Sequence, residues 1–227
     1  MTIAERLAEV RERIAAAAAR SGRPPEAVTL VAVTKTFGPE SVREALAAGQ
    51  RDFGENYVQE AAAKIEAVGA KAARWHFIGH LQTNKARQAA PLFDVIQTVD
   101  GLSLARELDK RVAAEGRPLD ILVQVNVAGE EQKSGIAPEG AEDLLRGMAV
   151  LPALRVRGLM TMPPFLPAEE VRPYFRALRE LRDRLAARAI PGVALDELSM
   201  GISGDFEAAI EEGATIVRIG TAIFGER

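Results

Sequence analysis

The sequence predicts a single α/β domain in which eight parallel strands close into a TIM-type (β/α)8 barrel. Three observations lead to this fold class. The chain has 227 residues, a length that suits one α/β barrel. Short apolar runs alternate with amphipathic segments almost without interruption, an order that requires parallel strands joined by helical crossovers. Polar residues recur where the apolar runs end, as they do at the functional face of a barrel.

Each element follows from its own local pattern. An opening helix is predicted over residues 3–20, because apolar residues recur at helical spacing before a glycine–proline stop. Apolar runs bounded by turn residues predict strands over residues 29–35, 52–55, 74–80, 95–100, 120–126, 154–162, 197–201 and 216–224. Amphipathic segments predict helices between them, over residues 39–48, 56–68, 83–90, 102–115, 138–150, 168–188 and 204–212.

The same alternation is compatible with one other architecture, an open doubly wound sheet. No G-x-G-x-x-G string follows the first strand, so the phosphate-binding turn of the dinucleotide-binding version of that sheet is missing. The barrel is therefore the preferred architecture. Residues 1–227 are expected to form one domain, with the opening helix as an addition in front of the barrel.

The composition limits the kinds of site that the chain can carry. It contains no cysteine, which excludes disulfides, thiolate metal sites and a cysteine nucleophile and is compatible with a reducing cytoplasm. The formal net charge is −3, and Lys and Arg are scattered without a basic block, so nucleic-acid binding is not expected. There is no signal-peptide pattern and no apolar run of the ~20 residues that a membrane span needs. We therefore expect a cytoplasmic protein.

Lys35 is the clearest candidate for chemistry at the barrel mouth. Side chains alternate along the first strand, so Val31, Val33 and Lys35 share one of its faces. Desolvation lowers the pKa of a lysine amine, and the unprotonated amine is the form that attacks an aldehyde. Two simpler roles stay open from the sequence alone, because the lysine could extend into water or pair with Glu55.

Two neighbouring strand ends are rich in glycine and hydroxyl residues. The segment 199–207 leads from a strand into a helix predicted to begin near Ser203. Backbone N–H groups at a helix start favour a phosphate, and the loops after strands seven and eight are the recurrent phosphate site of this fold. The simpler alternative makes Ser203 an ordinary N-cap. The residues that favour phosphate at these two strand ends are Gly201, Gly204, Gly220 and Thr221.

A lysine and a phosphate cradle at one barrel mouth suit either a phosphorylated aldehyde cofactor or, in a Schiff-base aldolase, a sugar phosphate. Six strings decide between these ligands: Val33-Thr-Lys35, Phe53-Gly-Glu-Asn-Tyr-Val-Gln-Glu60, Trp75-His-Phe-Ile-Gly-His-Leu-Gln-Thr-Asn-Lys85, Gly158-Leu-Met-Thr-Met162, Ser199-Met-Gly-Ile-Ser203 and Val217-Arg-Ile-Gly-Thr-Ala-Ile-Phe-Gly225. They resemble the pyridoxal 5′-phosphate (PLP) homeostasis protein family over essentially the whole chain. That family has the barrel of the alanine racemase class without its second, β-rich domain. One departure is Ile202, where another methionine is expected.

The resemblance implies PLP as the cofactor and assigns a role to eight residues. Lys35 would hold PLP as a Schiff base, and Asn56 would lie near the cofactor ring or its 3′-oxygen. Arg218 would face the pyridine nitrogen. The remaining implied residues surround the phosphate, with Ser203, Gly220 and Thr221 as its ligands and Ser199 and Met200 lining the loop.

The implied position of Arg218 bears on reactivity. A carboxylate beside the pyridine nitrogen keeps it protonated and makes the ring a strong electron sink. A guanidinium is always charged and cannot accept that proton, so the ring would stay a weak sink, suited to holding PLP more than to stabilising carbanions. From the sequence alone, Arg218 could instead form a surface ion pair.

The main functional prediction is a PLP-binding protein of PLP homeostasis, a carrier or buffer without robust catalytic activity that keeps PLP available to apo-enzymes. The alternative is a PLP-dependent amino-acid racemase, which needs a second acid–base group opposite the lysine. The chain has no cysteine, its tyrosines are Tyr57 and Tyr174, and it ends at Arg227 directly after the last predicted strand. We therefore expect no second catalytic domain, and a monomer.

Other polar residues near strand ends have simpler expected roles. His76 and His80 share a face of the third predicted strand, but no third ligand accompanies them, so a metal site is not expected. Asp100 and Asn126 could order the barrel mouth or cap helices.

Overall fold

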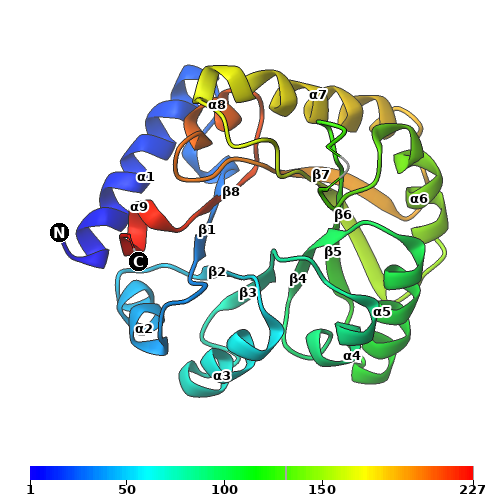
Figure 1. The fold of residues 1–227 in the computed structure, drawn as a ribbon, viewed down its shortest axis with the longest axis horizontal. Coiled ribbons are helices and arrows are strands. Elements are labelled where there is room, and N and C mark those ends of the chain that lie inside the picture. Colours follow the sequence, from blue (N-terminus) through cyan, green and yellow to red (C-terminus); the bar gives the residue numbers. More distant parts are fainter. Residues whose placement is uncertain (131, 227) are drawn as a thin grey trace.

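The computed structural model describes residues 1–130 and 132–226. Eight parallel strands close into one barrel in the order of the sequence, and the last strand pairs with the first. Figure 1 shows the strands in the middle and the helices around them. The predicted closed barrel is confirmed, and the open-sheet alternative is wrong. Within the described residues, no helix has both the length and the apolar character needed to cross a membrane.

The elements alternate as predicted, although several bounds differ. The strands are β1 (Thr29–Val33), β2 (Asp52–Glu55), β3 (Arg74–Phe77), β4 (Val95–Val99), β5 (Leu119–Gln124), β6 (Leu154–Met160), β7 (Val193–Ser199) and β8 (Ile216–Ile219). The α-helices are α1 (Ile3–Arg20), α2 (Pro39–Ala47), α3 (Val58–Val68), α4 (Ala86–Ala89), α5 (Leu102–Glu115), α6 (Ala141–Met148), α7 (Ala168–Ala186), α8 (Phe206–Glu211) and α9 (Thr221–Phe224). The 3₁₀ turns are η1 (Pro25–Ala27), η2 (Thr83–Lys85) and η3 (Pro138–Gly140).

The end of the chain differs from the prediction. A strand was expected over residues 216–224, but β8 ends at Ile219 and the last four of these residues form α9. Ile223 and Phe224 are buried, and the ring of Phe224 packs with that of Phe37 at 5.3 Å between centroids. A short apolar run does not reveal by its pattern whether it is strand or helix, so packing in the folded chain decides.

Seven of the eight predicted strands extend too far at their carboxyl ends, and only the strand over residues 52–55 ends where it was expected. β1 ends at Val33 and β3 ends at Phe77, so Lys35 and His80 lie in loops. Directly after β1 the N–H of Phe37 donates to the carbonyl oxygen of Thr34 at 3.0 Å, which turns the chain toward α2. Lys35 and His80 at the barrel mouth therefore belong to the segments that follow the strands, and the strands themselves end before these residues.

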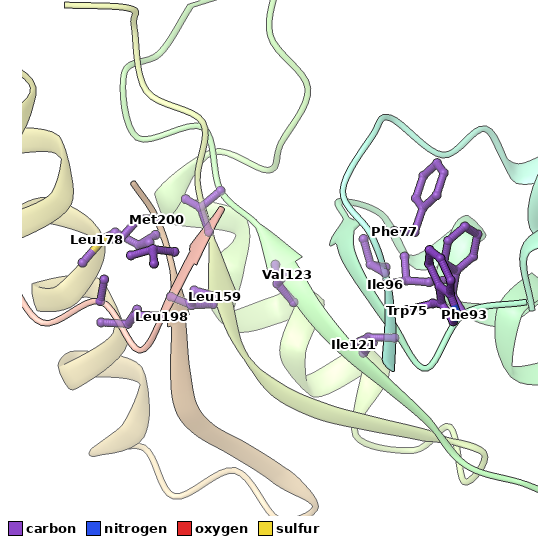
Figure 2. Close-up of a cluster of buried hydrophobic side chains, with 14 of the residues drawn as sticks. Trp75, Phe77, Phe93, Ile96, Ile121, Val123, Leu159, Leu178, Leu198 and Met200 are labelled. Atoms are coloured by element: carbon purple, nitrogen blue, oxygen red, sulfur yellow. The ribbon is translucent and has the colours of Figure 1, made fainter. Parts of the chain in front are cut away.

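An apolar layer between the barrel and its helices forms the main core. Alternate residues of each strand point outward into this layer, and Figure 2 shows Trp75 beside Phe93 as one part of it. Figure 2 also places Leu198 and Met200 next to Leu178 of α7. Burying one large apolar side chain stabilises a fold by roughly 1.5–3 kcal/mol, so this layer dominates stability.

The barrel interior has an apolar and a polar part. The intervening strand residues point inward, and four of them form a small apolar cluster: Val31, Leu122, Met160 and Ile216. Other inward-facing residues are polar and also fully buried, namely His76, Gln97, Ser199 and Arg218. The polar part extends upward to the barrel mouth, because Arg218 also lines the cavity described below.

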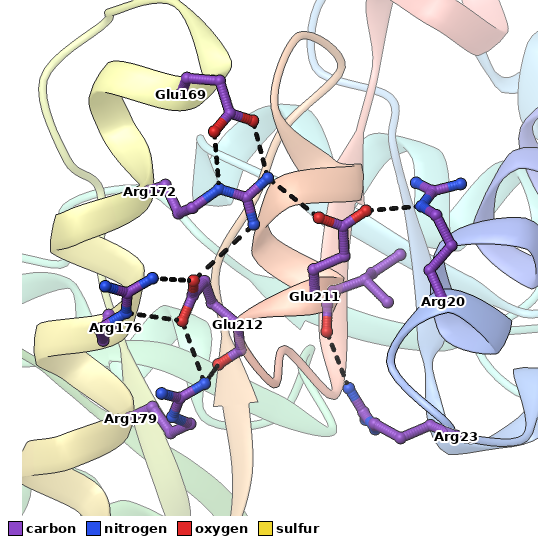
Figure 3. A network of polar contacts seen from close by, with 9 residues as sticks. Arg20, Arg23, Glu169, Arg172, Arg176, Arg179, Glu211 and Glu212 are labelled. Atoms are coloured by element: carbon purple, nitrogen blue, oxygen red, sulfur yellow. Dashed lines mark hydrogen bonds and ion pairs between the residues drawn. The ribbon is translucent and has the colours of Figure 1, made fainter.

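The additional helix α1 packs against α8 and α9 where β8 meets β1 (Figure 1). Its start is fixed by a capping box, in which Thr2 and Glu5 bond to each other's backbone N–H groups. Arg20 of α1 pairs with Glu211 of α8 at 2.7 Å. Figure 3 shows that Glu211 and its neighbour Glu212 connect α8 to arginines of α7 as well. One ionic network therefore joins α1, α7 and α8.

Candidate functional site

A cavity of about 370 Å³ opens at the carboxyl ends of the strands. This volume is typical of a site for a small molecule. Six of the eight predicted site residues line it, since Lys35, Asn56, Ser203, Arg218, Gly220 and Thr221 are all in its wall. The other lining residues are Val33, Phe37, Ile78, Met162, Phe165, Ile202, Gly204 and Gly225.

Lys35 reaches the cavity from the turn after β1. Its side chain is half-buried. The next residue, Thr36, has a φ of 70°, a left-handed conformation that is unusual for a β-branched residue and marks local backbone strain. The N–H of Thr36 donates to the carboxylate of Glu60 in α3. This bond helps to hold a strained turn, and the turn presents Lys35 to the cavity.

A buried ion pair lies behind this turn. Lys64 of α3 is 3% exposed, and its Nζ lies 2.7 Å from Oε1 of Glu55 and 2.7 Å from Oε1 of Glu60. The same Nζ donates to the carbonyl oxygen of Thr34 at 2.5 Å. Burial raises the pKa of Glu55, while hydrogen bonds from Lys64 and Thr34 act in the opposite direction. Glu55, considered above as a partner for Lys35, is thus bound by Lys64.

The loops after β7 and β8 form another part of the wall and lie side by side. The N–H of Arg218 donates to the carbonyl oxygen of Gly201 at 3.0 Å, and the N–H of Ala222 donates to Oγ of Ser203 at 3.4 Å. A Cβ added to Gly204 would meet no atom within 4 Å, so this stretch of backbone is open. The structure thereby brings together Ser203, Gly204, Gly220 and Thr221.

Ser203 does not cap α8, the helix that follows it in the chain. Helix α8 begins at Phe206, its N-cap residue is Asp205, and that cap makes no side-chain hydrogen bond. Oδ1 of Asp205 instead accepts from the N–H of Ile202 at 2.6 Å and so holds the loop. Burial raises the pKa of Asp205, against the lowering by this bond and by the charge of Arg218. The N-cap alternative for Ser203 is therefore wrong.

Arg218 is a buried cation that also reaches the cavity. It is 2% exposed, and its guanidinium donates to Oγ of Ser199 at 2.5 Å, to the carbonyl oxygen of Thr161 at 2.9 Å and to Sδ of Met162 at 3.0 Å. Burial lowers the pKa of Arg218 to about 10, and the charge of Asp205 opposes this effect. The residue is therefore charged at neutral pH. A surface ion pair, the alternative from the sequence, is wrong.

Asn56 presents a polar atom that lacks a partner. Its Oδ1 is buried and has no hydrogen-bond partner among the described residues, an arrangement that is costly unless something binds there. Gly79 supports the backbone of Asn56 from behind, because a Cβ at Gly79 would lie 2.1 Å from the carbonyl oxygen of Asn56. Close backbone packing thus fixes Asn56 at the cavity wall.

Two of the predicted residues are not part of this wall. Ser199 is fully buried inside the barrel, where its hydroxyl bonds to Gln97 and to Arg218. Met200 points the other way, into the layer next to Leu178 (Figure 2). Adjacent residues of an extended chain point to opposite sides. Ser199 points into the barrel interior and Met200 into the outer apolar layer, so neither side chain lines the cavity.

Comparison with known proteins shows the family. The model of the alanine racemase N-terminal domain matches residues 6–227. A pyridoxal phosphate homeostasis protein of Aquifex aeolicus is 49% identical over 228 residues, covering 100% of this chain and 99% of the relative. A relative of the same name from Escherichia coli K12 is 46% identical and covers 99% of this chain and 97% of its own length. The chain belongs to the pyridoxal phosphate homeostasis protein family.

A solved structure of this family has the same fold. PipY of Synechococcus elongatus, which was solved with PLP bound, is 40% identical to this chain with a TM-score of 0.86. The match covers 99% of this chain and 100% of PipY. Both the resemblance noted in the sequence and the predicted alanine racemase-like barrel are confirmed.

The sequence did not predict the apolar residues of the cavity wall. Phe37, Ile78 and Phe165 line the cavity, and Phe165 is 90% exposed. Apolar residues near strand ends look like core residues in a sequence, so Phe37 and Ile78 gave no separate signal. Phe165 could have been found, because it follows two prolines in a loop at a strand end, where an aromatic residue has no obvious core to fill.

Three other polar residues at the barrel mouth hold the loop after β5 in place. His80, Asp100 and Asn126 each bond to a residue of that loop, so the first of the two roles expected for Asp100 and Asn126 applies. Within residues 1–130 and 132–226, no group of three or more acidic or histidine side chains could hold a metal ion. The loop contacts are His80 Nδ1 to Ser134 Oγ at 3.0 Å, the N–H of Gly135 to Asp100 Oδ2 at 3.2 Å, and Asn126 Nδ2 to the carbonyl oxygen of Glu130 at 2.8 Å.

Proposed function

We propose that this protein binds PLP in the cavity at the barrel mouth and serves PLP homeostasis as a carrier. The observation that carries the proposal is the convergence of Lys35 with the two glycine- and hydroxyl-rich loops on one cavity. PLP has an aldehyde and a phosphate, and these two groups require a nucleophilic amine and an anion cradle. PLP bound to PipY, a 40% identical relative, supports the same ligand here.

The residues present fit this cofactor. The Lys35 amine would attach it covalently through the aldehyde. Ser203 and Thr221 would supply hydroxyl groups to the phosphate, while the backbone at Gly204 and Gly220 allows the anion to come close. Asn56 has a buried oxygen without a partner at the same wall, and a polar substituent of the ring would satisfy its amide. Ser199 and Met200 would act only indirectly, since neither lines the cavity.

Arg218 would determine how reactive the held cofactor is. PLP supplies an electron sink to amino-acid chemistry, and its strength depends on protonation of the pyridine nitrogen. Arg218 is a cation at neutral pH with a pKa of about 10, and it lines the cavity. A fixed positive charge beside the nitrogen disfavours a second one. This protein's own contribution is therefore to hold the cofactor in a weakly reactive form.

The carrier role is preferred over an amino-acid racemase for a second reason. Racemisation needs an acid–base group on the far side from the lysine. Tyr57 is 59% exposed at the start of α3, and Tyr174 packs against the outer core. Neither lines the cavity. Delivery to apo-enzymes, a monomeric state and a cytoplasmic location remain predictions.

The attachment experiment uses purified protein incubated with PLP and reduced with borohydride. Before reduction, wild type should show the visible absorption of lysine-bound PLP, and this absorption should disappear on reduction. Mass spectrometry of the reduced protein after proteolysis should then find the pyridoxyl group on Lys35. Lys35→Ala should lose both signals, whereas Lys85→Ala, a control outside the cavity wall, should keep them. Recovery of the label on Lys85 or Lys133 in the wild type would contradict the assignment.

The choice between carrier and racemase needs a separate measurement. In D₂O, exchange at Cα of L-alanine can be followed by NMR even when no net racemisation occurs. We expect exchange no faster than with free PLP, together with transfer of bound PLP to an apo-enzyme. Fast exchange that is lost on changing Tyr57 or Tyr174 to Phe would establish a racemase-like enzyme instead.

A further inference from the structure

A continuous chain of hydrogen bonds crosses the interior of the barrel and ends at Arg218. It involves one residue from each of five strands, β2, β3, β4, β7 and β8. Arg218 Nη1 donates to Ser199 Oγ at 2.5 Å, and Ser199 Oγ lies 2.6 Å from Gln97 Oε1. Gln97 Nε2 lies 2.9 Å from His76 Nδ1, and His76 Nε2 lies 2.9 Å from Asp52 Oδ1. Four of these five residues, all except Asp52, are at most 2% exposed.

The two end residues of this series of hydrogen bonds, Arg218 and Asp52, fix the direction of every bond between them. A guanidinium can only donate and an ionised carboxylate can only accept. Ser199 therefore accepts from Arg218 and gives its own proton to Gln97 Oε1. The amide nitrogen of Gln97 must then donate to His76 Nδ1, which leaves the proton of a neutral His76 on Nε2, facing Asp52. Each group therefore donates or accepts as its chemistry allows, and all the hydrogen bonds run in one direction, from Arg218 to Asp52, with the donor of each bond on the Arg218 side.

We propose that Ser199, Gln97 and His76 form a positioning relay that fixes the orientation of the Arg218 guanidinium toward the cofactor cavity. This inference rests on the proposed function, because the relay holds Arg218, the cation that would face the pyridine nitrogen of PLP. It assigns a role to Ser199 that is different from lining the phosphate loop. It also gives two residues of the barrel interior, Gln97 and His76, a role in cofactor binding without contact to the cofactor.

The relay works because, among the described residues, Arg218 has no charged hydrogen-bond partner that would orient it. Its three side-chain partners are a hydroxyl, a carbonyl and a thioether. The hydroxyl of Ser199 accepts from Arg218 and directs its proton to Gln97, and Gln97 is held in turn by His76. A break at either link leaves the Ser199 proton without a fixed acceptor, so the hydroxyl is no longer held in the orientation that accepts from Arg218.

The first arm of the test reads the relay in the protein without PLP. The chain has two histidines, so ¹⁵N NMR resolves both rings, and His80 at the mouth is an internal reference. Wild-type His76 should show the Nε2–H tautomer. Gln97→Glu replaces the donor beside Nδ1 by an acceptor, so His76 should then carry protons on both nitrogens. An Nδ1–H tautomer in the wild type, or no response to Gln97→Glu, would overturn the relay.

The second arm reads the coupling to the cofactor. If the relay positions Arg218, PLP binding should shift the His76 resonances, since coupling between two sites is reciprocal. In Gln97→Leu and Ser199→Ala this shift should vanish and the Kd for PLP should rise roughly tenfold, as expected for a weakened bond to a charged group. Gln124→Leu is the matched control, because Gln124 is also a buried barrel glutamine but bonds to the carbonyl oxygen of Ser134.

The outcomes separate the two proposals. Wild-type and Ser199→Ala proteins that bind PLP equally, with the same His76 shift, would rule out the relay. A purely structural role would lower the melting temperature of Gln97→Leu and Gln124→Leu alike and leave the His76 response to PLP intact, which would also rule it out. Absence of PLP binding by the wild type would overturn the proposed function alone, because the tautomer is read without PLP.

Discussion

The Nζ of Lys64 donates to the carbonyl oxygen of Thr34 at 2.5 Å, so a buried lysine of α3 holds the residue directly before Lys35. The same ammonium group pairs with Glu55 and Glu60, and Glu60 in turn accepts from the N–H of Thr36. The backbone on both sides of Lys35 is therefore tied to one ion cluster. The orientation of Lys35 depends on residues that never touch the cavity.

Replacing Lys64 by methionine should destabilise the protein strongly. The substitution leaves the carboxylate of Glu55, which is fully buried, without its cation, and breaking a buried pair typically costs about 3–5 kcal/mol. Urea denaturation of Lys64→Met measures this loss, with Lys71→Met, an exposed lysine just beyond α3, as control. The double variant Lys64→Met/Glu55→Gln should recover more than half of the lost stability. No recovery would mean that the ion pair is not the source of the effect.

Removing the two hydroxyl groups at the loops after β7 and β8 should weaken the binding of PLP selectively. Ser203→Ala and Thr221→Val each remove a donor to a dianion, and a hydrogen bond to a charged group contributes roughly 1.5–3 kcal/mol, or one to two decades in Kd. Titration with PLP and with pyridoxal, which lacks the phosphate, separates this loss from a general one. Equal losses for both ligands would show that the loops do not contact phosphate.

Gly79→Ala should displace Asn56. A Cβ at Gly79 would lie 2.1 Å from the backbone oxygen of Asn56, and backbone atoms cannot move aside as a flexible side chain does. We expect lower stability, by about 1–3 kcal/mol, and weaker PLP binding. Gly101→Ala is the matched control, because a Cβ there meets nothing within 4 Å. If both variants bind PLP like the wild type, Asn56 does not contribute to the site.

The ionic network around Glu212 should make stability depend on acid pH. Its carboxylate lies 2.8 Å from Arg176 and 3.0 Å from Arg179 (Figure 3), and the bond to Arg176 followed by the charges of the arginines keeps the pKa of Glu212 low. Because the folded pKa lies below the unfolded value of about 4.3, the stabilisation is present above that pH. It is lost as the pH falls through the folded pKa.

Chemical denaturation of wild type and Glu212→Gln at pH 7 and at pH 3 tests this dependence. At pH 7 the variant should be less stable by about 1–2 kcal/mol, a value reduced because the arginines are partly exposed to solvent. The difference should shrink at pH 3. Glu169→Gln, in the more exposed pair with Arg172, should not change stability measurably. A difference for Glu212→Gln that is independent of pH would point to packing rather than charge.

The sequence alone determined the alternation of helices with parallel strands and the chemical character of the mouth. The strict alternation of apolar runs and amphipathic segments allows only a parallel sheet, and this property is local to each segment. Lys35 and the loops at Ser203 and Gly220 were found for the same reason, because they follow strands directly. The strings that resemble the homeostasis family include these positions, and the comparisons confirm that family.

Only the tertiary structure decided which residues act behind the mouth. Ser199 and Met200 are adjacent in the chain, yet the first bonds inside the barrel and the second packs outside it, because side chains of extended residues alternate. The contact between Ser199 and Gln97 spans 102 positions, and no local pattern encodes a contact of that length. Barrel closure brings such residues together, and the cost of burying unpaired polar groups then selects their partners.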